Sequence, residues 1–394
     1  MTDVAERLEE LRERGLYRRL RLIEGPQGPS VTLDGRPVLL LCSNNYLGLA
    51  DRAEVREAAA EAALRWGAGA GASRLISGNM EPHRRLETRL AAFKGYEAAL
   101  LFGSGYLANT GAIAALAGKG EVVFSDELNH ASIVDGCRLS RADTFVYRHA
   151  DVEHLAWGLH RAGGRAALIV TDGVFSMDGD VAPLPELLEL ARRHGARLMV
   201  DEAHATGAVG PGGRGSVSAA GLSGEVDVVV GTLGKALGSY GAYVCASAET
   251  VDFLVNSARP FIFSTAPPPP AVGAALAALE VLEREPELVE RLQANAAALR
   301  SALSDEGLDV GRSETQVVPV EVGEAETTMA LCELALQRGV FVQGIRPPTV
   351  PEGSSRLRFT AMASHRAEEL VGAARQVGAA AREVGLVEPQ PLAA

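Results

Sequence analysis

The chain has 394 residues, more than one small core requires, so we expect a large domain and a smaller one. Hydrophobic residues make up 47% of it and charged residues 22%, as in ordinary globular proteins. The formal net charge of −12 argues against a general nucleic-acid binder, whose affinity comes from neutralising phosphates.

The cysteines and the N-terminal segment indicate the compartment. The four cysteines are scattered with no CxxC pair, so we expect no metal site and no disulfide framework, and a reducing cytoplasm fits. Residues 1–10 are charged and helical in pattern, unlike a signal peptide, and no apolar stretch reaches membrane-spanning length. We therefore expect a cytoplasmic protein with neither nucleic acid nor membrane as a partner.

Residues 1–40 are predicted to form an N-terminal arm, with an arginine-rich amphipathic helix and a hairpin that turns at Asp34 and Gly35. In residues 41–275, short β-branched runs alternate with helical stretches, which is typical of an α/β domain with a mostly parallel sheet covered on both faces. Ligands of such sheets bind at the carboxyl ends of the strands. The strands are predicted at 98–102, 121–125, 166–171, 197–200, 226–231 and 242–246, and the clearest helices at 51–66, 108–117 and 185–194.

The four prolines at 267–270 are expected to end this region, because proline cannot continue a strand or a helix interior. A long helix is predicted at 272–303. Residues 276–394 are predicted to form a small C-terminal α/β domain, with strands near 317–322, 340–345 and 356–360. We expect residues 387–394 to be frayed.

Lys235 is the most informative residue of the chain. Only three of the 38 basic residues are lysines, and Lys235 follows a buried-strand pattern at 226–230, whereas Lys94 and Lys119 lie beside glycines in predicted turns. An amine can condense with a carbonyl to form a Schiff base, and a guanidinium cannot. A lysine at a loop tip with no chemical role is the alternative.

A second chemical group follows the strand predicted at 197–200. Asp201 stands at its carboxyl end and His204 one turn beyond, at the sheet edge that also receives Lys235. A carboxylate, an imidazole and a lone lysine at one edge are what a pyridoxal phosphate (PLP) site needs, because the carboxylate keeps the pyridine nitrogen protonated. Taken alone, Asp201 is as readily a helix N-cap and His204 a structural loop histidine.

The run Asp201-Glu-Ala-His204 also spells a helicase box. That class needs a GxxxxGK[ST] phosphate loop upstream of the box. The only Gly-Lys match with a preceding strand lies downstream, with Val229 in place of the first glycine and Ala236 in place of Ser or Thr. We therefore set the nucleic-acid ATPase aside.

Three further segments follow predicted strands. In residues 102–109, Gly105 and Tyr106 open a helix whose free N–H groups can hold a phosphate, although a plain tight turn is as good an interpretation. His130 follows the strand at 121–125 and can stack on a flat ring. Ser176 follows the strand at 166–171 and reaches the same edge.

Together these segments resemble the α-oxoamine synthase family of fold-type I PLP enzymes, which join an amino acid to an acyl thioester and release carbon dioxide. Residues 41–49, Leu-Cys-Ser-Asn-Asn-Tyr-Leu-Gly-Leu, resemble its N-terminal signature. The segments 69–78, 175–180, 201–207 and 231–238 follow in matching order, so the resemblance covers about residues 15–365.

Within the family, residues 344–351, Gly-Ile-Arg-Pro-Pro-Thr-Val-Pro, look most like the biotin-pathway branch, which condenses L-alanine with pimeloyl-CoA or pimeloyl-acyl carrier protein. A sister synthase of the glycine C-acetyltransferase type, with another amino acid or acyl donor, is the alternative. A non-catalytic binding protein on the same fold is a third candidate, although no expected catalytic residue is missing.

The resemblance carries roles onto single residues. It implies that Lys235 holds PLP covalently, Asp201 pairs with its ring nitrogen, His204 contacts its phenolic oxygen and His130 stacks on its ring near the substrate. It assigns the phosphate to Gly105, Tyr106 and Thr232, places Ser176 near the ring, and implies a homodimer with a shared site in which Ser264 and Thr265 reach the neighbouring phosphate. It assigns substrates to Arg18, Asn44, Thr349 and Arg358. Asp172 stands where some members have glutamate, which leaves its role open.

Overall fold

The computed structural model describes residues 3–388, and they divide into two compact units. Unit 1 comprises residues 1–48, 177–179 and 290–394, and unit 2 comprises residues 49–176 and 180–289. The sequence-based boundaries at 40 and 275 therefore lie several residues from those of the compact units. The last residues of the predicted frayed end, 389–394, lie outside the described part.

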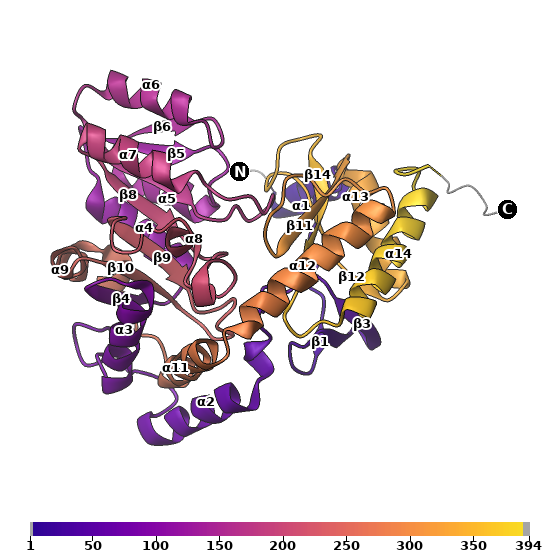
Figure 1. Ribbon diagram of the computed structural model, residues 1–394, viewed down its shortest axis with the longest axis horizontal. Helices are drawn as coiled ribbons and strands as arrows, with labels where there is room; N and C mark the ends of the chain where they lie inside the picture. Colours follow the sequence, from indigo (N-terminus) through magenta and orange to yellow (C-terminus); the bar gives the residue numbers. More distant parts are fainter. Residues whose placement is uncertain (1–2, 389–394) are drawn as a thin grey trace. The chain divides into compact units, whose positions relative to one another are not determined.

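Unit 2 is built on one seven-stranded sheet with the order β4-β10-β9-β8-β7-β5-β6 (Figure 1). Strand β10 is antiparallel to both of its neighbours, and the strands from β9 to β6 are parallel. This is the mostly parallel sheet that the sequence predicted. The strands are β4 Ala98–Phe102, β5 Val122–Asp126, β6 Asp143–Tyr147, β7 Ala166–Asp172, β8 Arg197–Asp201, β9 Val228–Thr232 and β10 Ala242–Ala246.

Both faces of this sheet are buried, which explains the continuous apolar runs of its strands. Alternate side chains such as Val123, Val170 and Met199 form one core cluster with α4 and α5, and their neighbours along each strand point to the other face. The helices of this unit are α2 Ala53–Trp66, α3 Glu81–Lys94, α4 Gly105–Leu116, α5 Ala131–Ser140, α6 Val152–Ala162, α7 Leu184–His194, α8 Ser216–Ala219, α9 Ala248–Ser257, α10 Arg259–Ile262 and α11 Pro269–Arg284, with 3-10 turns at Leu49–Asp51 and Pro211–Gly213.

Many helices begin or end at capping residues of the types that favour a helix terminus. The hydroxyl of Ser104 accepts from the backbone N–H of Leu107 at the start of α4, and the carboxylate of Asp151 accepts from that of His154 in α6. Helices α3, α6 and α7 end at glycines in the left-handed conformation, which a residue with a Cβ adopts only at a cost.

Unit 1 contains two smaller sheets, with the orders β1-β2-β3-β12 and β11-β14-β13. Strands β2 and β3 pair antiparallel across Asp34 and Gly35, so the predicted hairpin is confirmed. The elements are α1 Val4–Glu13, β1 Ile23–Glu24, β2 Ser30–Leu33, β3 Arg36–Leu40, α12 Glu287–Asp305 (whose first residues belong to unit 2), β11 Val317–Gly323, α13 Ala325–Gln337, β12 Val340–Phe341, β13 Gln343–Ile345, β14 Ser355–Thr360 and α14 Ala367–Glu383.

Three predictions of secondary structure were wrong. The helix expected at 272–303 is divided into α11 and α12, because Pro286 has no N–H to donate and its ring clashes with the preceding turn. The strand expected at 340–345 is two strands in different sheets, with β12 parallel to β3 and β13 antiparallel to β14. The four prolines do not precede the next helix: α11 begins at Pro269, where proline fits the first turn.

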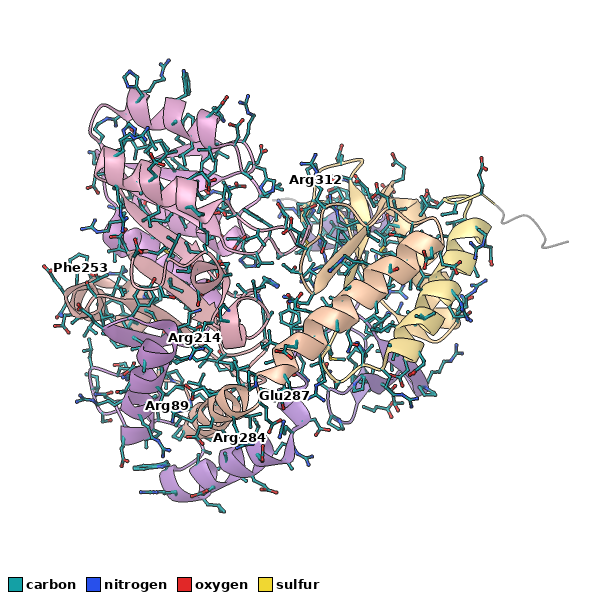
Figure 2. The ribbon with its side chains drawn as sticks, in the orientation of Figure 1. Arg89, Arg214, Phe253, Arg284, Glu287 and Arg312 are labelled. Carbon is teal, nitrogen blue, oxygen red and sulfur yellow. The ribbon has the colours of Figure 1, made fainter. Side chains whose placement is uncertain are left out.

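Lys94 lies in a buried ion pair and not in a turn. Its Nζ contacts the Glu202 carboxylate, the backbone carbonyl of Arg214 and, at 3.3 Å, the Thr206 hydroxyl. Glu202 also accepts from the Ser216 hydroxyl and the Val217 backbone N–H. The surface pairs differ: Arg89 of α3, labelled in Figure 2, meets Glu280 and Glu283 of α11 where solvent screens the charges.

The described cysteines are all free. Burial raises the pKa of Cys42 to about 12, that of Cys137 to about 11 and that of Cys245 to about 12, and it also raises the pKa of Cys332. Unpaired cysteines were expected from their spacing. No helix within residues 3–388 combines the length and apolar character that crossing a lipid bilayer would take.

Replacing Lys94 with methionine should destabilise the protein strongly. The variant Lys94→Met leaves the Glu202 carboxylate buried without its cation, which costs about 3–5 kcal/mol. Urea unfolding would measure the loss, and Lys119→Met, at an exposed lysine, is the matched control. Equal stability of the two variants would contradict a stabilising role for the pair.

Candidate active site

The candidate site lies in unit 2, at the carboxyl ends of three adjacent strands. Asp172 ends β7, Asp201 ends β8 and Thr232 ends β9, and Asp172 is the direct partner of Asp201 in the sheet register. A cavity of about 180 Å³ opens there. It is lined by Gly105, Tyr106, Asn109, His130, Ser132, Asp172, Asp201, Ala203, His204, Thr232 and Lys235.

Lys235 and His204 meet in this cavity. Lys235 follows β9 and His204 follows β8, and the distance from Lys235 Nζ to His204 Nε2 is 2.7 Å. This contact needs a donor N–H on one nitrogen and a lone pair on the other. The pair can therefore hold a proton between an amine and an imidazole at the strand ends.

Asp201 is buried, and both of its carboxylate oxygens accept hydrogen bonds from protein groups. Its Oδ2 accepts from Asn109 Nδ2 at 2.6 Å, and its Oδ1 accepts from the backbone N–H of Ala203 at 2.8 Å. Asn109 lies on α4, one turn beyond Gly105, so both residues face the cavity from one side of the helix. Two donors fix the direction of this carboxylate.

The neighbouring carboxyl group, Asp172, lies in a different environment. Its Oδ2 accepts from the backbone N–H of His130 at 2.9 Å. Burial, followed by the charge of Asp201, raises the pKa of Asp172 well above its usual value. Ionising both of two buried carboxyl groups at adjacent strand ends costs electrostatic free energy, so Asp172 is the protonated one.

His130 caps α5 and presents its ring to the cavity. Its Nδ1 lies 2.7 Å from the Ser132 hydroxyl and 3.2 Å from the Ser132 backbone nitrogen. Burial lowers the pKa of His130; the charge of Asp201 opposes this change and that of Lys235 adds to it. A neutral ring that is held at one nitrogen leaves its flat face for contact with a planar ligand.

The start of α4 forms one end of the cavity. A Cβ built on Gly105 would meet no atom within 4 Å, so the backbone N–H groups there are accessible to a ligand. The hydroxyl of Thr232 donates to the Gly241 carbonyl at 3.1 Å and accepts from the Gly234 backbone N–H at 3.2 Å. This end has the backbone donors that a phosphate needs.

Seven of the residues singled out in the sequence line the one cavity: Gly105, Tyr106, His130, Asp201, His204, Thr232 and Lys235. Asp172, whose role the sequence left open, lines it as well. Ser176, Ser264 and Thr265 are not among the lining residues; Ser176 is buried, and Thr265 is exposed and bridges to Ser73. Sequence reasoning missed Asn109, Ser132 and Ala203, although the four-residue spacing from Gly105 could have indicated Asn109.

Comparisons with known proteins agree over almost the whole chain. Residues 36–377 match the family described as aminotransferase class I and II. A curated 8-amino-7-oxononanoate synthase of Geobacter sulfurreducens is 56% identical over 98% of this chain and 99% of its own. Another, of Citrifermentans bemidjiense, is 54% identical over 98% of this chain and 100% of its own.

The chain belongs to the 8-amino-7-oxononanoate synthases of this aminotransferase family.

Solved structures place this synthase among PLP-binding relatives. A serine palmitoyltransferase from S. paucimobilis with bound PLP-myriocin aldimine superposes with a TM-score of 0.93 at 35% identity, covering 98% of each chain. A Francisella tularensis 8-amino-7-oxononanoate synthase has a TM-score of 0.76 at 27% identity, covering 88% of this chain and 98% of its own. The expected fold class, a fold-type I PLP transferase fold, is therefore confirmed.

The synthase has a second, larger cavity, which lies wholly within unit 1. It measures about 550 Å³ and includes Arg18, Thr349 and Arg346 in its lining. Arg346 is buried, and its Nη2 donates to the Tyr17 carbonyl at 2.8 Å, while its Nε has no hydrogen-bond partner in residues 3–388. Burial and then the charge of Arg18 lower the pKa of Arg346. Two cations thus line a cavity in which Arg346 has no carboxylate partner among residues 3–388.

The other predicted substrate residues also lie in unit 1. Arg358 is buried on β14, and its charge and a hydrogen bond act on the Tyr46 hydroxyl. That hydroxyl donates to Asn44 Oδ1 at 3.1 Å. Arg358, Tyr46 and Asn44 therefore form one connected polar group.

The titration of Asp172 gives a test of this electrostatic arrangement. Because its folded pKa is raised, its contribution to stability is fully present below the unfolded pKa of about 3.9 and is lost as pH rises toward the folded pKa. Asp172→Asn removes the titration and keeps an oxygen for the His130 N–H. We expect the variant, free of cofactor, to gain stability over wild type as pH rises from about 5 to about 8, measured by urea unfolding. A difference that is equal at both pH values would contradict a neutral Asp172.

Proposed function

We propose that the protein binds pyridoxal phosphate at the unit 2 cavity and condenses L-alanine with a pimeloyl thioester, either pimeloyl-CoA or pimeloyl-acyl carrier protein. The products are 8-amino-7-oxononanoate, carbon dioxide and the free thiol, a step of biotin biosynthesis. The observation that carries the proposal is the lysine–histidine contact beside a buried, doubly hydrogen-bonded aspartate at the strand ends. The unpaired cysteines agree with the cytoplasmic location that we propose.

The residues present fit the cofactor. The cavity has N–H donors of α4 at one end, a neutral flat imidazole on its wall and an amine at Lys235. Asn109 Oδ1 is buried without a hydrogen-bond partner in the described residues, and it lies beside Asp201, where the protonated ring nitrogen would be the donor. Gly105, Tyr106 and Thr232 would hold the phosphate, and His130 would lie on the ring.

When bound, pyridoxal phosphate supplies a carbonyl for amines and a ring that withdraws electrons from the Cα of the amino acid. Asp201 would hold a proton at the ring nitrogen, and Asn109 and the Ala203 N–H keep its carboxylate in place. Lys235 Nζ takes the Cα proton of L-alanine and later returns one. His204, 2.7 Å from that nitrogen, orients the amine and would contact the phenolic oxygen of the cofactor.

For the substrates, we assign the α-carboxylate of alanine to Arg358, with Asn44 nearby. Ser176 is assigned to the ring, and Ser264 and Thr265 to the phosphate of a second subunit in a homodimer with shared sites. An arginine on the carboxylate would keep the bond to the departing carbon dioxide in one orientation.

The unit 1 cavity is assigned to the acyl donor. Apolar side chains in its lining, including Ile345 and Leu336, suit the methylene chain of the acyl group. The guanidinium groups of Arg18 and Arg346 suit a carboxylate at the far end of that chain. The missing partner of Arg346 Nε supports this assignment. Thr349 contributes a hydroxyl to the same wall.

A sister synthase that uses another amino acid or acyl donor is the second candidate. The match to serine palmitoyltransferase at a TM-score of 0.93 is the specific observation in its favour. The higher identity to the curated 8-amino-7-oxononanoate synthases favours alanine and pimeloyl.

The deciding experiment is thiol release from pimeloyl-CoA with L-alanine, glycine and L-serine compared side by side. We expect release with L-alanine, and none from Lys235→Ala, which loses the amine yet still binds the cofactor by its other contacts. Cofactor absorbance of the variant would verify binding. Release with glycine or L-serine alone would favour the sister synthase, and an active Lys235→Ala would overturn the role of the amine.

The arginine pair predicts selectivity for a charged acyl end. Arg346→Gln should raise KM for pimeloyl-CoA by about 10- to 100-fold, because it removes a charge-assisted hydrogen bond. KM for heptanoyl-CoA, which has no distal carboxylate, should not change. Arg36→Gln, at an exposed arginine of β3, is the control. An equal rise for both thioesters would contradict contact with the carboxylate.

A further inference from the structure

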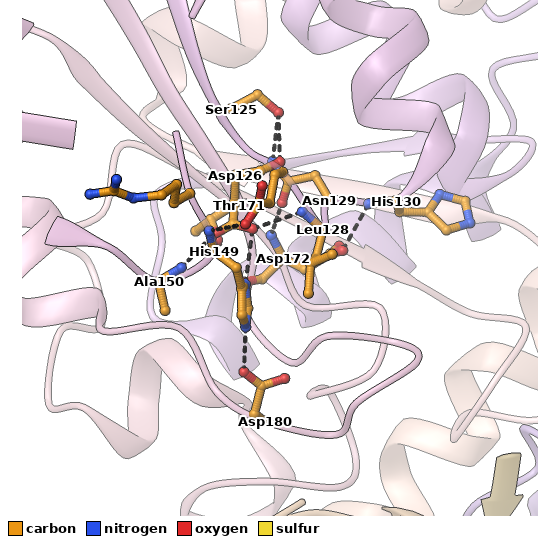
Figure 3. Close-up of polar contacts among 12 residues, drawn as sticks. Ser125, Asp126, Leu128, Asn129, His130, His149, Ala150, Thr171, Asp172 and Asp180 are labelled. Atoms are coloured by element: carbon orange, nitrogen blue, oxygen red, sulfur yellow. Dashed lines mark hydrogen bonds and ion pairs between the residues drawn. The ribbon is translucent and has the colours of Figure 1, made fainter. Parts of the chain in front are cut away.

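His149, which the proposed chemistry does not use, lies between two carboxylates. Its Nδ1 is 3.0 Å from Asp126 Oδ1, and its Nε2 is 2.7 Å from Asp180 Oδ2 (Figure 3). Both ring nitrogens therefore face acceptors, which only the doubly protonated ring can satisfy together. Burial alone lowers the pKa of His149, but the hydrogen bonds and charges of Asp126 and Asp180 outweigh it and raise the pKa to about 10.

Asp126 connects this histidine to the backbone that carries His130. It ends β5, and its Oδ1 also accepts from the Leu128 N–H at 2.9 Å, while its Oδ2 accepts from the Ala150 N–H at 2.8 Å. Asn129 then donates to the Val170 carbonyl and accepts from the Asp172 N–H, both at 2.8 Å. The turn from Asp126 to His130 is thus fixed at successive residues (Figure 3).

Asp180 connects the same histidine to the backbone that carries Ser176. The Asp180 carbonyl accepts from the Phe175 N–H at 3.0 Å, and Val174 bridges to Val181. The Phe175 ring stands edge-on to the imidazole, with centroids 4.4 Å apart and planes at 88°. Asp180 Oδ1 is buried without a hydrogen-bond partner in residues 3–388, so His149 is the group that stabilises this carboxylate.

We infer that His149 is a positioning residue, whose imidazolium ties the turn that carries His130 to the turn that carries Ser176. It acts through Asp126 and Asp180 and does not touch the reacting atoms. Removing the charge would leave two carboxylates facing each other with no cation between them, and the two turns would separate. The inference rests on the proposed function, because His130 and Ser176 matter only if the cofactor binds beside them.

The test compares His149→Gln with His160→Gln, an exposed histidine of α6. The measurements are the dissociation constant of pyridoxal phosphate, the absorption spectrum of the bound cofactor, kcat with L-alanine, and Tm of the cofactor-free protein. We expect His149→Gln to weaken cofactor binding and lower kcat by about tenfold each, with a changed spectrum, because small displacements of cofactor contacts are costly. His160→Gln should match wild type.

A lower Tm with unchanged cofactor affinity, spectrum and kcat would overturn the inference, since His149 would then only stabilise the fold. Asp180→Asn removes the ion pair between His149 and Asp180 at a partly exposed side chain. It tests the same inference if His149→Gln does not fold. We expect it to weaken cofactor binding in the same direction, and the double variant to lose less than the sum of the two. Failure of wild type to bind the cofactor would instead refute the proposed function.

Discussion

Two buried carboxyl groups stand side by side at the ends of β7 and β8, and the rest of the site depends on how their charge is divided. The sheet register makes Asp172 and Asp201 direct neighbours, so a single negative charge is the inexpensive state. Donors from Asn109 and Ala203 stabilise the charge on Asp201. The Lys235 amine and the His130 ring, whose pKa is lowered by burial, line the same cavity as this pair.

The parallel topology makes this arrangement possible. Residues 172, 201 and 232 are distant in sequence, yet they end adjacent strands. The loops that follow these strands carry Ser176, His204 and Lys235. Apolar side chains are buried on both faces of the sheet. The loops are then fixed by ion pairs of their own: Lys94 with Glu202 beside Asp201, and His149 with Asp126 ahead of His130.

Local pattern was enough to predict much of this arrangement. Short apolar runs located β4, β5, β7, β8, β9 and β10 to within about two residues, and polar residues after them located the cavity. The edge strand β6 was missed although Thr144, Phe145 and Val146 are residue types that favour a strand; most of it is exposed, as is common at a sheet edge. The division of α11 from α12 was not predicted, because the helical pattern continues on both sides of Pro286, which separates the two helices. Asn109 and Lys94 depend on contacts with residues about 90 or more positions away, which no local pattern contains.

The scarcity of lysine was informative for a reason beyond the sequence argument. Of three lysines, Lys235 lines the cavity and Lys94 is the cation of a buried pair, where a compact ammonium fits a space that a guanidinium fork would not. Two of the three lysines thus occupy positions where an ammonium makes specific contacts, whereas the third, Lys119, is exposed.

The buried cysteines have a consequence for an enzyme whose reaction sets a thiol free. With the pKa values of Cys42, Cys137 and Cys245 near 11 or 12, almost no thiolate forms on them at neutral pH. Mixed disulfides between protein and released coenzyme A require such a thiolate or its oxidised form. The raised pKa values of these thiols therefore disfavour their exchange with disulfides of the released thiol.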